Sequence, residues 1–236
     1  MSGALWLLPV ALGDVPWQDY LPTASRDAAC RLTHFAVENA KTARAELKRI
    51  GHPVPLRELA IEQLPAAPTM ADIERLLAPL RAGHDMGLMS EAGCPAVADP
   101  GALLVRRAHE LGLTVKPLVG PSSILLALMA SGLDGQRFAF HGYLPAREPE
   151  RGQRIAELET ESARLTQTQL FIETPYRNLA LFNALLLTCR ATTRLCLATD
   201  LTLGSEKIAT RRIADWKTAS PPNLDKRPTV FLLLAD

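Results

Sequence analysis

Short apolar runs alternate with amphipathic segments along the first half of the chain. The runs predict buried strands at residues 4–10, 34–38, 59–64, 85–89 and 113–119. In the segments between them, apolar residues recur every three or four positions, which predicts helices at 39–50, 69–80 and 102–111. Strands that alternate with helices at this spacing form βαβ units, so we expect a mainly parallel sheet in this half.

The second half has fewer helices for each strand. Strands are predicted at 137–144, 169–173, 195–199, 205–212 and 229–234, and helices at 146–162 and 178–187. This pattern favours a mixed sheet, so we expect an α/β chain of two domains, residues 1–118 and 119–236. A nearly all-apolar helix at 124–130 follows the boundary, and its composition predicts burial on most of its surface.

Composition narrows the class of protein. The chain has 236 residues, of which 47% are hydrophobic and 22% are charged, as in globular proteins. Its 26 basic and 25 acidic residues give a formal net charge of +1. This excludes a strongly basic nucleic-acid coat protein and an acidic tail protein, although a local basic patch remains compatible with the balance.

Cysteine usage and hydropathy point to the cytoplasm. The four cysteines and five histidines lack the spacing of zinc ligands, so we expect no metal site and reduced, mostly buried thiols. The apolar N-terminus has no basic region and predicts a first strand rather than a signal peptide. The longest uncharged run, 117–133, is broken by glycine, proline and serine, which excludes a membrane span.

Three loops each follow a predicted strand and precede a helix, at residues 9–14, 90–101 and 120–123. In open α/β sheets, ligands bind at these carboxyl ends of strands. The second loop is long and contains glycines that permit unusual backbone conformations. Each loop also has a plain structural interpretation: Asp99 would be the N-cap of the next helix with Pro100 at its first position, and Ser122 or Ser123 would cap the apolar helix.

A series of motifs in fixed order resembles the tetrapyrrole methylase family. The segments are SEAGCPAVADPG, VGPSSILLALMASGL, FAFHGYLP, IETPYRN, TDLTLGSEKI and RPTVFLLL, and they cover nearly the whole chain. Within the family, VENAKTAR at 37–44 is similar to the branch of ribosomal small-subunit RNA ribose 2′-O-methyltransferases. Two segments depart from that branch: Glu-Asn-Ala-Lys-Thr-Ala-Arg at 38–44 and Thr-Asp-Leu-Thr at 199–202.

The resemblance implies a cytoplasmic, homodimeric, two-domain methyltransferase that binds S-adenosylmethionine in a cleft between its domains. By their matching positions, eight residues would contact this cofactor: Leu12, Gly93, Cys94, Val97, Ser122, Ser123, Glu173 and Leu201.

The methyl acceptor would be RNA, for which a carboxylate is expected to assist the ribose hydroxyl. Glu91 is the first candidate for this catalytic role and Glu38 the second, while Arg44 and Arg147 are candidates to hold phosphates. Two alternatives stay open at the level of sequence. One is a methyltransferase of a tetrapyrrole or other small molecule, and the other is a catalytically silent S-adenosylmethionine-binding module.

Overall fold

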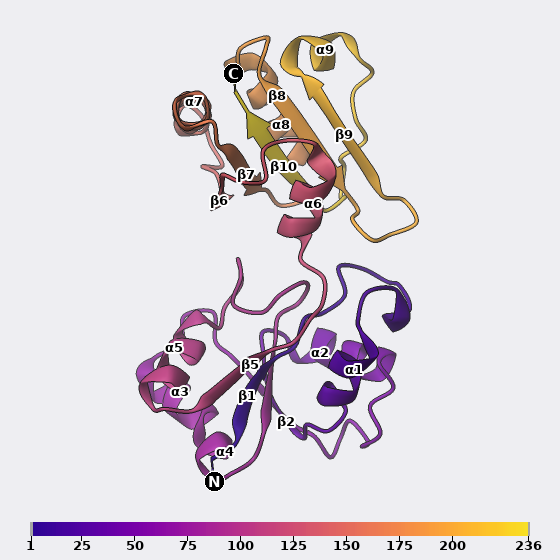
Figure 1. The fold of residues 1–236 in the computed structure, drawn as a ribbon, viewed down its shortest axis with the longest axis vertical. Helices are drawn as coiled ribbons and strands as arrows, with labels where there is room; N and C mark the ends of the chain where they lie inside the picture. Colours follow the sequence, from indigo (N-terminus) through magenta and orange to yellow (C-terminus); the bar gives the residue numbers. More distant parts are fainter. Residues whose placement is uncertain (1, 236) are drawn as a thin grey trace. The chain divides into compact units, whose positions relative to one another are not determined.

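The computed structural model describes residues 2–235, and the chain divides into two compact units between Ser122 and Ser123 (Figure 1). The first unit contains five strands, a 3-10 helix and five α-helices. In chain order these are β1 (Ala4–Leu7), η1 (Trp17–Asp19), α1 (Thr23–Ala29), β2 (His34–Val37), α2 (Ala40–Arg49), β3 (Ala60–Gln63), α3 (Met70–Leu76), α4 (Ala78–Arg81), β4 (Met86–Met89), α5 (Ala102–Glu110) and β5 (Thr114–Pro117).

The sheet of the first unit is parallel throughout, which confirms the prediction. Its strand order is β3-β2-β4-β1-β5, and every neighbouring pair runs in the same direction. Because all five strands are parallel, each connection between consecutive strands leads from one end of the sheet back to the other. The carboxyl ends of β2, β4, β1 and β5 therefore lie next to one another along one edge.

Helices cover both faces of this sheet, as Figure 1 shows. Phe35 and Val37 point to one face, where they pack with Leu47 of α2. Ala36, between them in sequence, points to the other face, which holds Leu104 of α5. The loops after the adjacent strands β1 and β4 consequently lead to helices on opposite faces. Such a topological switch point is where α/β sheets bind ligands.

The second unit is built around a mixed sheet, also as predicted. Its elements are α6 (Ser123–Ser131), β6 (Phe138–Tyr143), α7 (Glu150–Leu165), β7 (Thr168–Ile172), α8 (Asn178–Thr188), β8 (Arg194–Thr199), β9 (Lys207–Arg212), α9 (Ile213–Thr218) and β10 (Thr229–Leu234). The strand order is β6-β7-β10-β8-β9, with β6 and β7 parallel and the other pairs antiparallel.

Side chains alternate across this second sheet. Phe231 and Leu233 of β10 point into a core formed with α7, α8 and α9. The intervening Leu232 is fully buried on the opposite side, where α6 packs against β8, β9 and β10. The threonine hydroxyl of Thr210 on β9 donates a hydrogen bond of 2.6 Å to the carbonyl of Ser131, which fixes the end of α6.

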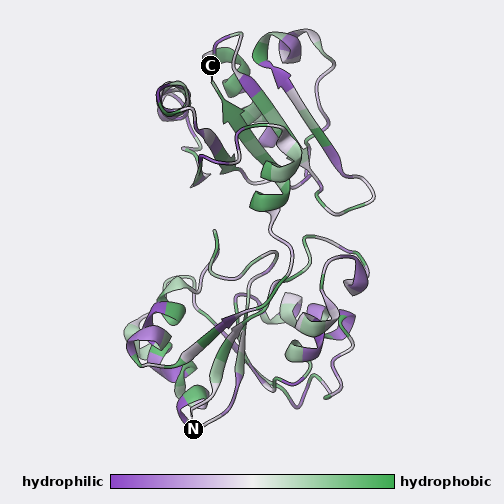
Figure 2. Ribbon diagram, in the orientation of Figure 1, coloured by the Kyte–Doolittle hydropathy of each residue, from purple (hydrophilic) through white to green (hydrophobic). Residues whose placement is uncertain are grey.

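The prediction that the apolar helix is buried on most of its surface is wrong. Ile124, Ala127 and Leu128 of α6 are buried against the sheet, whereas Leu125 is 53% and Met129 80% exposed. Figure 2 shows that α6 is hydrophobic along its length. A helix packed on one sheet buries only the stripe that faces it, so an all-apolar composition leaves an apolar face outside the packing within this unit.

Three local predictions also fail. The N-cap of α5 is Gly101, with φ of 130°, and no side chain caps this helix, so Asp99 is not its cap. The helix predicted at 146–162 begins at Glu150, because Pro145 and Pro149 cannot supply the N–H groups that a helix requires. Helices α1 and α9 were not predicted, since they are short and α1 consists mainly of small and polar residues.

Within residues 2–235, no helix is both long and apolar enough to cross a membrane. All four cysteines are free thiols, as expected. Only two of them, Cys189 and Cys196, are buried, while Cys30 and Cys94 are half-buried. The prediction that most thiols are buried therefore holds for the second unit alone, because Cys30 ends a surface helix and Cys94 lies in a loop.

Candidate functional site

The three predicted loops of the first unit meet at the carboxyl end of its sheet. Val10, after β1, and Gly93, after β4, form an isolated antiparallel bridge, in which each N–H donates to the other carbonyl at 2.9 and 3.0 Å. Gly93 has φ of 71°, a conformation that glycine adopts without strain. This bridge lies at the switch point between β1 and β4, so the first two loops are joined to each other by backbone hydrogen bonds.

The third loop is held to the other two by close backbone packing. The thiol of Cys94 donates a hydrogen bond of 3.3 Å to the carbonyl of Pro121. Gly120 lies against Pro9 so closely that a Cβ at this position would stand 2.5 Å from the Cβ of the proline. No side chain fits there. Glycine at 120 is therefore required for the first and third loops to pack.

These contacts bring together some of the residues of the first unit that are predicted to bind the cofactor. Leu12 lies beside Gly93, since a Cβ added to that glycine would stand 3.5 Å from Leu12 Cδ2. Cys94 follows directly, whereas the side chain of Val97 is 48% exposed on the same loop. Ser122 ends the first unit, and Ser123 is the first residue of α6 in the second unit.

The two predicted catalytic carboxylates also lie together. The backbone N–H of Glu91, after β4, donates a hydrogen bond of 3.0 Å to Oε2 of Glu38, after the neighbouring strand β2. The side chain of Glu91 is exposed and that of Glu38 is half-buried. Because only the backbone of Glu91 makes this bond, its own carboxylate remains available for other partners.

Sequence reasoning missed two residues of this cluster, Ser90 and Asp99. Ser90 is 3% exposed, and its hydroxyl lies beside the carboxyl group of Asp99. Burial raises the pKa of Asp99 to about 6, and the charge of Glu38 adds to this rise. The Ser90 hydroxyl lowers the pKa, and the charge of Glu91 raises it by a smaller amount. Only the folded loop brings Asp99 back to Glu38, and its place before Pro100 indicated a helix cap instead.

We expect the Asp99→Asn variant to be more stable than the parent at high pH. The pKa of Asp99 is raised above its ordinary 3.8 because the fold favours the protonated carboxyl. Its contribution to the stability of the parent is fully present below pH 4 and is lost as the pH rises through 6. The rise from 3.8 to about 6 corresponds to at most ~3 kcal/mol in the free energy of unfolding. Solvent screening of this half-buried group lowers the expected gain to about 2 kcal/mol. Urea unfolding should show this gain at pH 8 and none at pH 4; an equal gain at both values would contradict it.

The Cys94 thiol is suited to structure rather than to nucleophilic chemistry. Burial raises the pKa of Cys94, so the thiol stays protonated at neutral pH. A protonated thiol can donate the observed hydrogen bond to Pro121. Cys94 therefore connects two loops, and the groups it offers to a ligand are those of its backbone.

The predicted residues of the second unit are both buried. Glu173 follows β7 and accepts hydrogen bonds of 2.6 Å from the N–H of Thr174 and 2.7 Å from Nη2 of Arg177. Burial pushes the pKa of Glu173 upward, but the bonds from Arg177 and Thr174 outweigh it and hold the pKa below its ordinary value. Glu173 is thus a fixed, ionised carboxylate.

Leu201 lies on a turn after β8 with an unusual backbone. Its neighbours Asp200 and Thr202 have φ of 52° and 71°, and non-glycine residues in this conformation are uncommon. Such strain persists only where surrounding contacts hold it in place. The hydroxyl of Thr202 is buried without a partner among the described residues.

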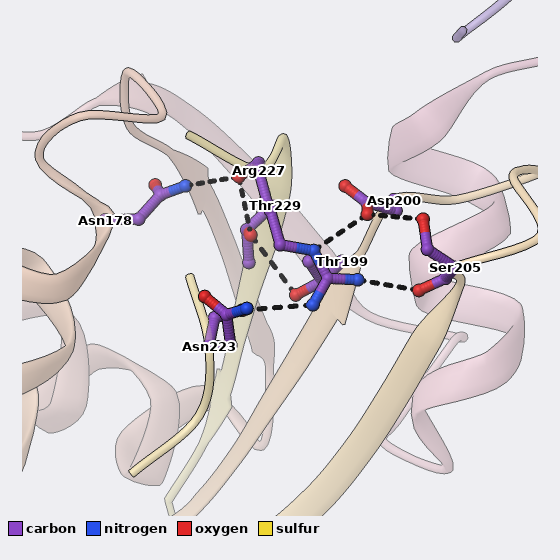
Figure 3. A network of polar contacts seen from close by, with 7 residues as sticks. All are labelled: Asn178, Thr199, Asp200, Ser205, Asn223, Arg227 and Thr229. Atoms are coloured by element: carbon purple, nitrogen blue, oxygen red, sulfur yellow. Dashed lines mark hydrogen bonds and ion pairs between the residues drawn. The ribbon is translucent and has the colours of Figure 1, made fainter. Parts of the chain in front are cut away.

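A polar network holds this turn, as Figure 3 shows. Arg227 donates to Oδ2 of Asp200 at 2.8 Å and to the carbonyl of Ser205 at 2.6 Å. The Ser205 hydroxyl donates to the same carboxylate oxygen at 2.7 Å, and Asn178 donates to the carbonyl of Arg227 at 2.7 Å. Three segments distant in sequence therefore fix the position of Leu201. The motif TDLTLGS indicated the turn, but its partner Arg227 could be identified only from the fold.

No group of histidine, cysteine, aspartate or glutamate side chains among residues 2–235 is arranged to hold a metal ion. The carboxylates Glu38, Glu91 and Asp99 lie close enough for their charges to interact. Their neighbours in the site are backbone groups, a serine hydroxyl and apolar side chains. This set of groups suits an organic ligand with both polar and apolar parts.

Comparisons with known proteins give two independent kinds of similarity. No family model matches the chain. Ribosomal RNA small subunit methyltransferase I of Xylella fastidiosa is 36% identical over 146 residues, which are 62% of this chain and 50% of that protein. The enzyme of the same name from Pseudomonas aeruginosa is 35% identical over 162 residues, 67% of this chain and 56% of that protein. The chain thus spans about half the length of these curated relatives.

Solved structures share the fold at low sequence identity. The methyltransferase CobJ superposes with a TM-score of 0.65 and 15% identity, over 100% of this chain and 95% of that one. A conserved hypothetical protein, APE0931 of Aeropyrum pernix K1, superposes with a TM-score of 0.69 and 14% identity, over 100% of this chain and 85% of that one. The fold and the sequence relatives confirm the resemblance drawn from the motifs. The chain shares the fold of these structures, and its sequence is similar to that of enzymes named ribosomal RNA small subunit methyltransferase I.

Proposed function

We propose that this protein is an S-adenosylmethionine-dependent methyltransferase that modifies a ribose 2′-hydroxyl of small-subunit ribosomal RNA. The observation that carries the proposal is sequence identity of 35–36% to enzymes named ribosomal RNA small subunit methyltransferase I. The arrangement of the first unit supports it, because three ligand-type loops converge at the switch point of a parallel sheet.

The residues at this switch point fit the cofactor. A Cβ at Gly93 would fill space between Leu12 and the carbonyl of Pro121, so the bare glycine leaves room for a ligand against the backbone. The buried hydroxyl of Ser90, beside Asp99, adds a polar group to the site. We assign Leu12, Gly93, Cys94, Val97, Ser122 and Ser123 to cofactor binding, and Glu173 and Leu201 of the second unit to contacts with its adenine.

The cofactor, when bound, supplies an electrophilic methyl group on a sulfonium. The residues of this chain must place the ribose oxygen in line with that methyl group and receive its proton. We assign the proton to the Glu91 carboxylate, with Glu38 holding the Glu91 backbone in place. In this assignment Glu91 would take up the proton that the ribose hydroxyl loses as its oxygen accepts the methyl group.

Two measurements test this function. Calorimetry should detect binding of S-adenosylmethionine and of its demethylated product to the purified chain. Incubation with cofactor labelled in the methyl group, together with 30S subunits from cells that lack the gene, should place label on ribosomal RNA. Absence of binding would refute the cofactor assignment, and binding without label on RNA would refute the substrate.

We further propose that the protein acts in the cytoplasm as a homodimer. The apolar face of α6, with Met129 80% exposed, supports association of two copies, because monomers rarely expose contiguous apolar surface of this kind. We expect Met129→Glu to shift the light-scattering mass from dimer toward monomer, and Thr188→Glu, at the end of α8, to leave it unchanged. A parent chain that is monomeric at all concentrations would refute the dimer.

A further inference from the structure

The charged residues on the solvent face of α2 in the first unit are all cationic. Lys41, Arg44 and Lys48 are exposed on this helix, whereas Ala43, Glu46 and Leu47 are buried. At 100° per residue the three cations fall within an arc of about 60°, and they are separated along the helix by about 4.5 and 6 Å. We call Lys41, Arg44 and Lys48 the basic stripe.

The cations of the basic stripe have no anionic partner among the described residues. Glu46 is the only acidic residue of α2, and its carboxylate is buried against Tyr20 and Arg49. Arg49, on the edge of the same helix, is neutralised by Glu46 at 2.6 Å and by Asp14 at 2.9 Å. Among the described residues, the one hydrogen bond that the Arg44 side chain makes goes to the carbonyl of Ala40, at 3.3 Å. The positive charge of the stripe is thus uncompensated.

This arrangement is unfavourable for the isolated helix. Lys41 stands in the first turn, where the helix dipole disfavours a cation. Arg44 and Lys48 are four residues apart, and like charges at this spacing on a helix repel each other. A polyanion bound along the stripe would remove both penalties. Charge complementarity therefore favours a phosphate backbone as its occupant.

The basic stripe also begins next to the proposed proton acceptor. Helix α2 starts two residues after Glu38, whose carboxylate accepts a hydrogen bond from the N–H of Glu91. Asn39 caps the helix, since its side-chain oxygen accepts from Lys41 N at 2.9 Å and from Thr42 N at 3.4 Å. We propose that Lys41, Arg44 and Lys48 bind consecutive phosphates of a single RNA strand, beside the ribose to be methylated. The inference rests on the proposed function and adds to it the surface that holds the substrate.

Fluorescence anisotropy with a short, labelled, single-stranded RNA tests the stripe without requiring catalysis. Binding is measured over a range of salt concentrations, in the presence of the demethylated cofactor. The Lys41→Gln/Arg44→Gln/Lys48→Gln variant should reduce the slope of log K against log salt by about 2, since each phosphate contact on a single strand contributes about 0.7. The control Arg31→Gln/Arg57→Gln/Arg106→Gln removes equal charge from other exposed positions and should leave the slope within experimental error.

The outcomes separate this inference from the proposed function. Loss of slope in the stripe variant alone supports the stripe. Equal slopes in parent and stripe variant refute it, and cofactor binding by calorimetry then still stands for the methyltransferase. An equal loss in stripe and control variants also refutes it, because the effect would be one of net charge. If instead the stripe variant loses binding to vesicles with phosphatidylserine while RNA binding is unchanged, the surface is for membranes and the inference is wrong.

Discussion

Replacement of Gly120 by alanine is expected to weaken cofactor binding by about ten- to a hundredfold. The new Cβ would stand 2.5 and 2.8 Å from the Cβ and Cγ of Pro9, and 3.5 Å from Leu21 Cδ1. A proline ring cannot rotate away, so the first and third loops must separate. Overpacking of this kind costs about 1–3 kcal/mol, and each 1.4 kcal/mol lost from binding is about tenfold in Kd.

The control for this substitution is Gly135→Ala. Gly135 has open space around the position of a Cβ and is not among the glycines with positive φ, so alanine should be accommodated there. Calorimetry of both variants with S-adenosylmethionine measures the effect, and circular dichroism confirms that each is folded. Equal affinity in the Gly120 variant and the parent would show that the packing of the loops is not needed for binding.

The Glu91→Gln variant is expected to lose about 10²- to 10⁴-fold in kcat, the range typical of a missing proton acceptor. The hydrogen bond to Glu38 is made by the backbone N–H of Glu91, so the amide side chain leaves the loop in place. Affinity for the cofactor should therefore be unchanged. Single-turnover transfer of labelled methyl groups to 30S subunits measures the rate, and calorimetry measures the affinity.

Two further variants make this prediction specific. Glu91→Asp keeps a carboxylate and should recover part of the rate, whereas a purely structural role would not distinguish aspartate from glutamine. Glu58→Gln removes an exposed carboxylate on another loop of the first unit and should leave kcat unchanged. A Glu91→Gln variant with the parent rate would place the proton acceptor elsewhere, with Glu38 and Asp99 as the remaining carboxylates of the cluster.

Most of the fold follows from patterns that are local in the chain. Each of the ten strands predicted from the sequence is present in the structure, because residues buried in a sheet must satisfy their backbone through neighbouring strands. The alternation of strands and helices before residue 118 indicated a parallel sheet, and its loss afterwards indicated a mixed one. The failures are also local in origin: short helices such as α1 have too few turns to show a period.

The sequence alone also identified which loops matter, since a glycine-containing loop between a strand and a helix is a property of the chain itself. The order of its motifs indicated the resemblance to a methyltransferase family, and its pattern singled out Glu38 and Glu91, which the fold brings into contact. What it could not supply is the distance between residues that are far apart in the chain. Glu38 and Glu91 are separated by 53 positions and meet only because β2 and β4 are neighbours in the sheet.

Only the tertiary structure decided the details that control the site. It showed that Asp99 lies close to Glu38 instead of capping α5, and that Ser90 is buried beside it. It showed that Gly120 is required by Pro9, 111 positions earlier, and that the turn of Leu201 depends on Arg227. The reason is physical: local pattern sets backbone conformation, whereas burial, desolvation and close packing depend on which segments the fold brings together.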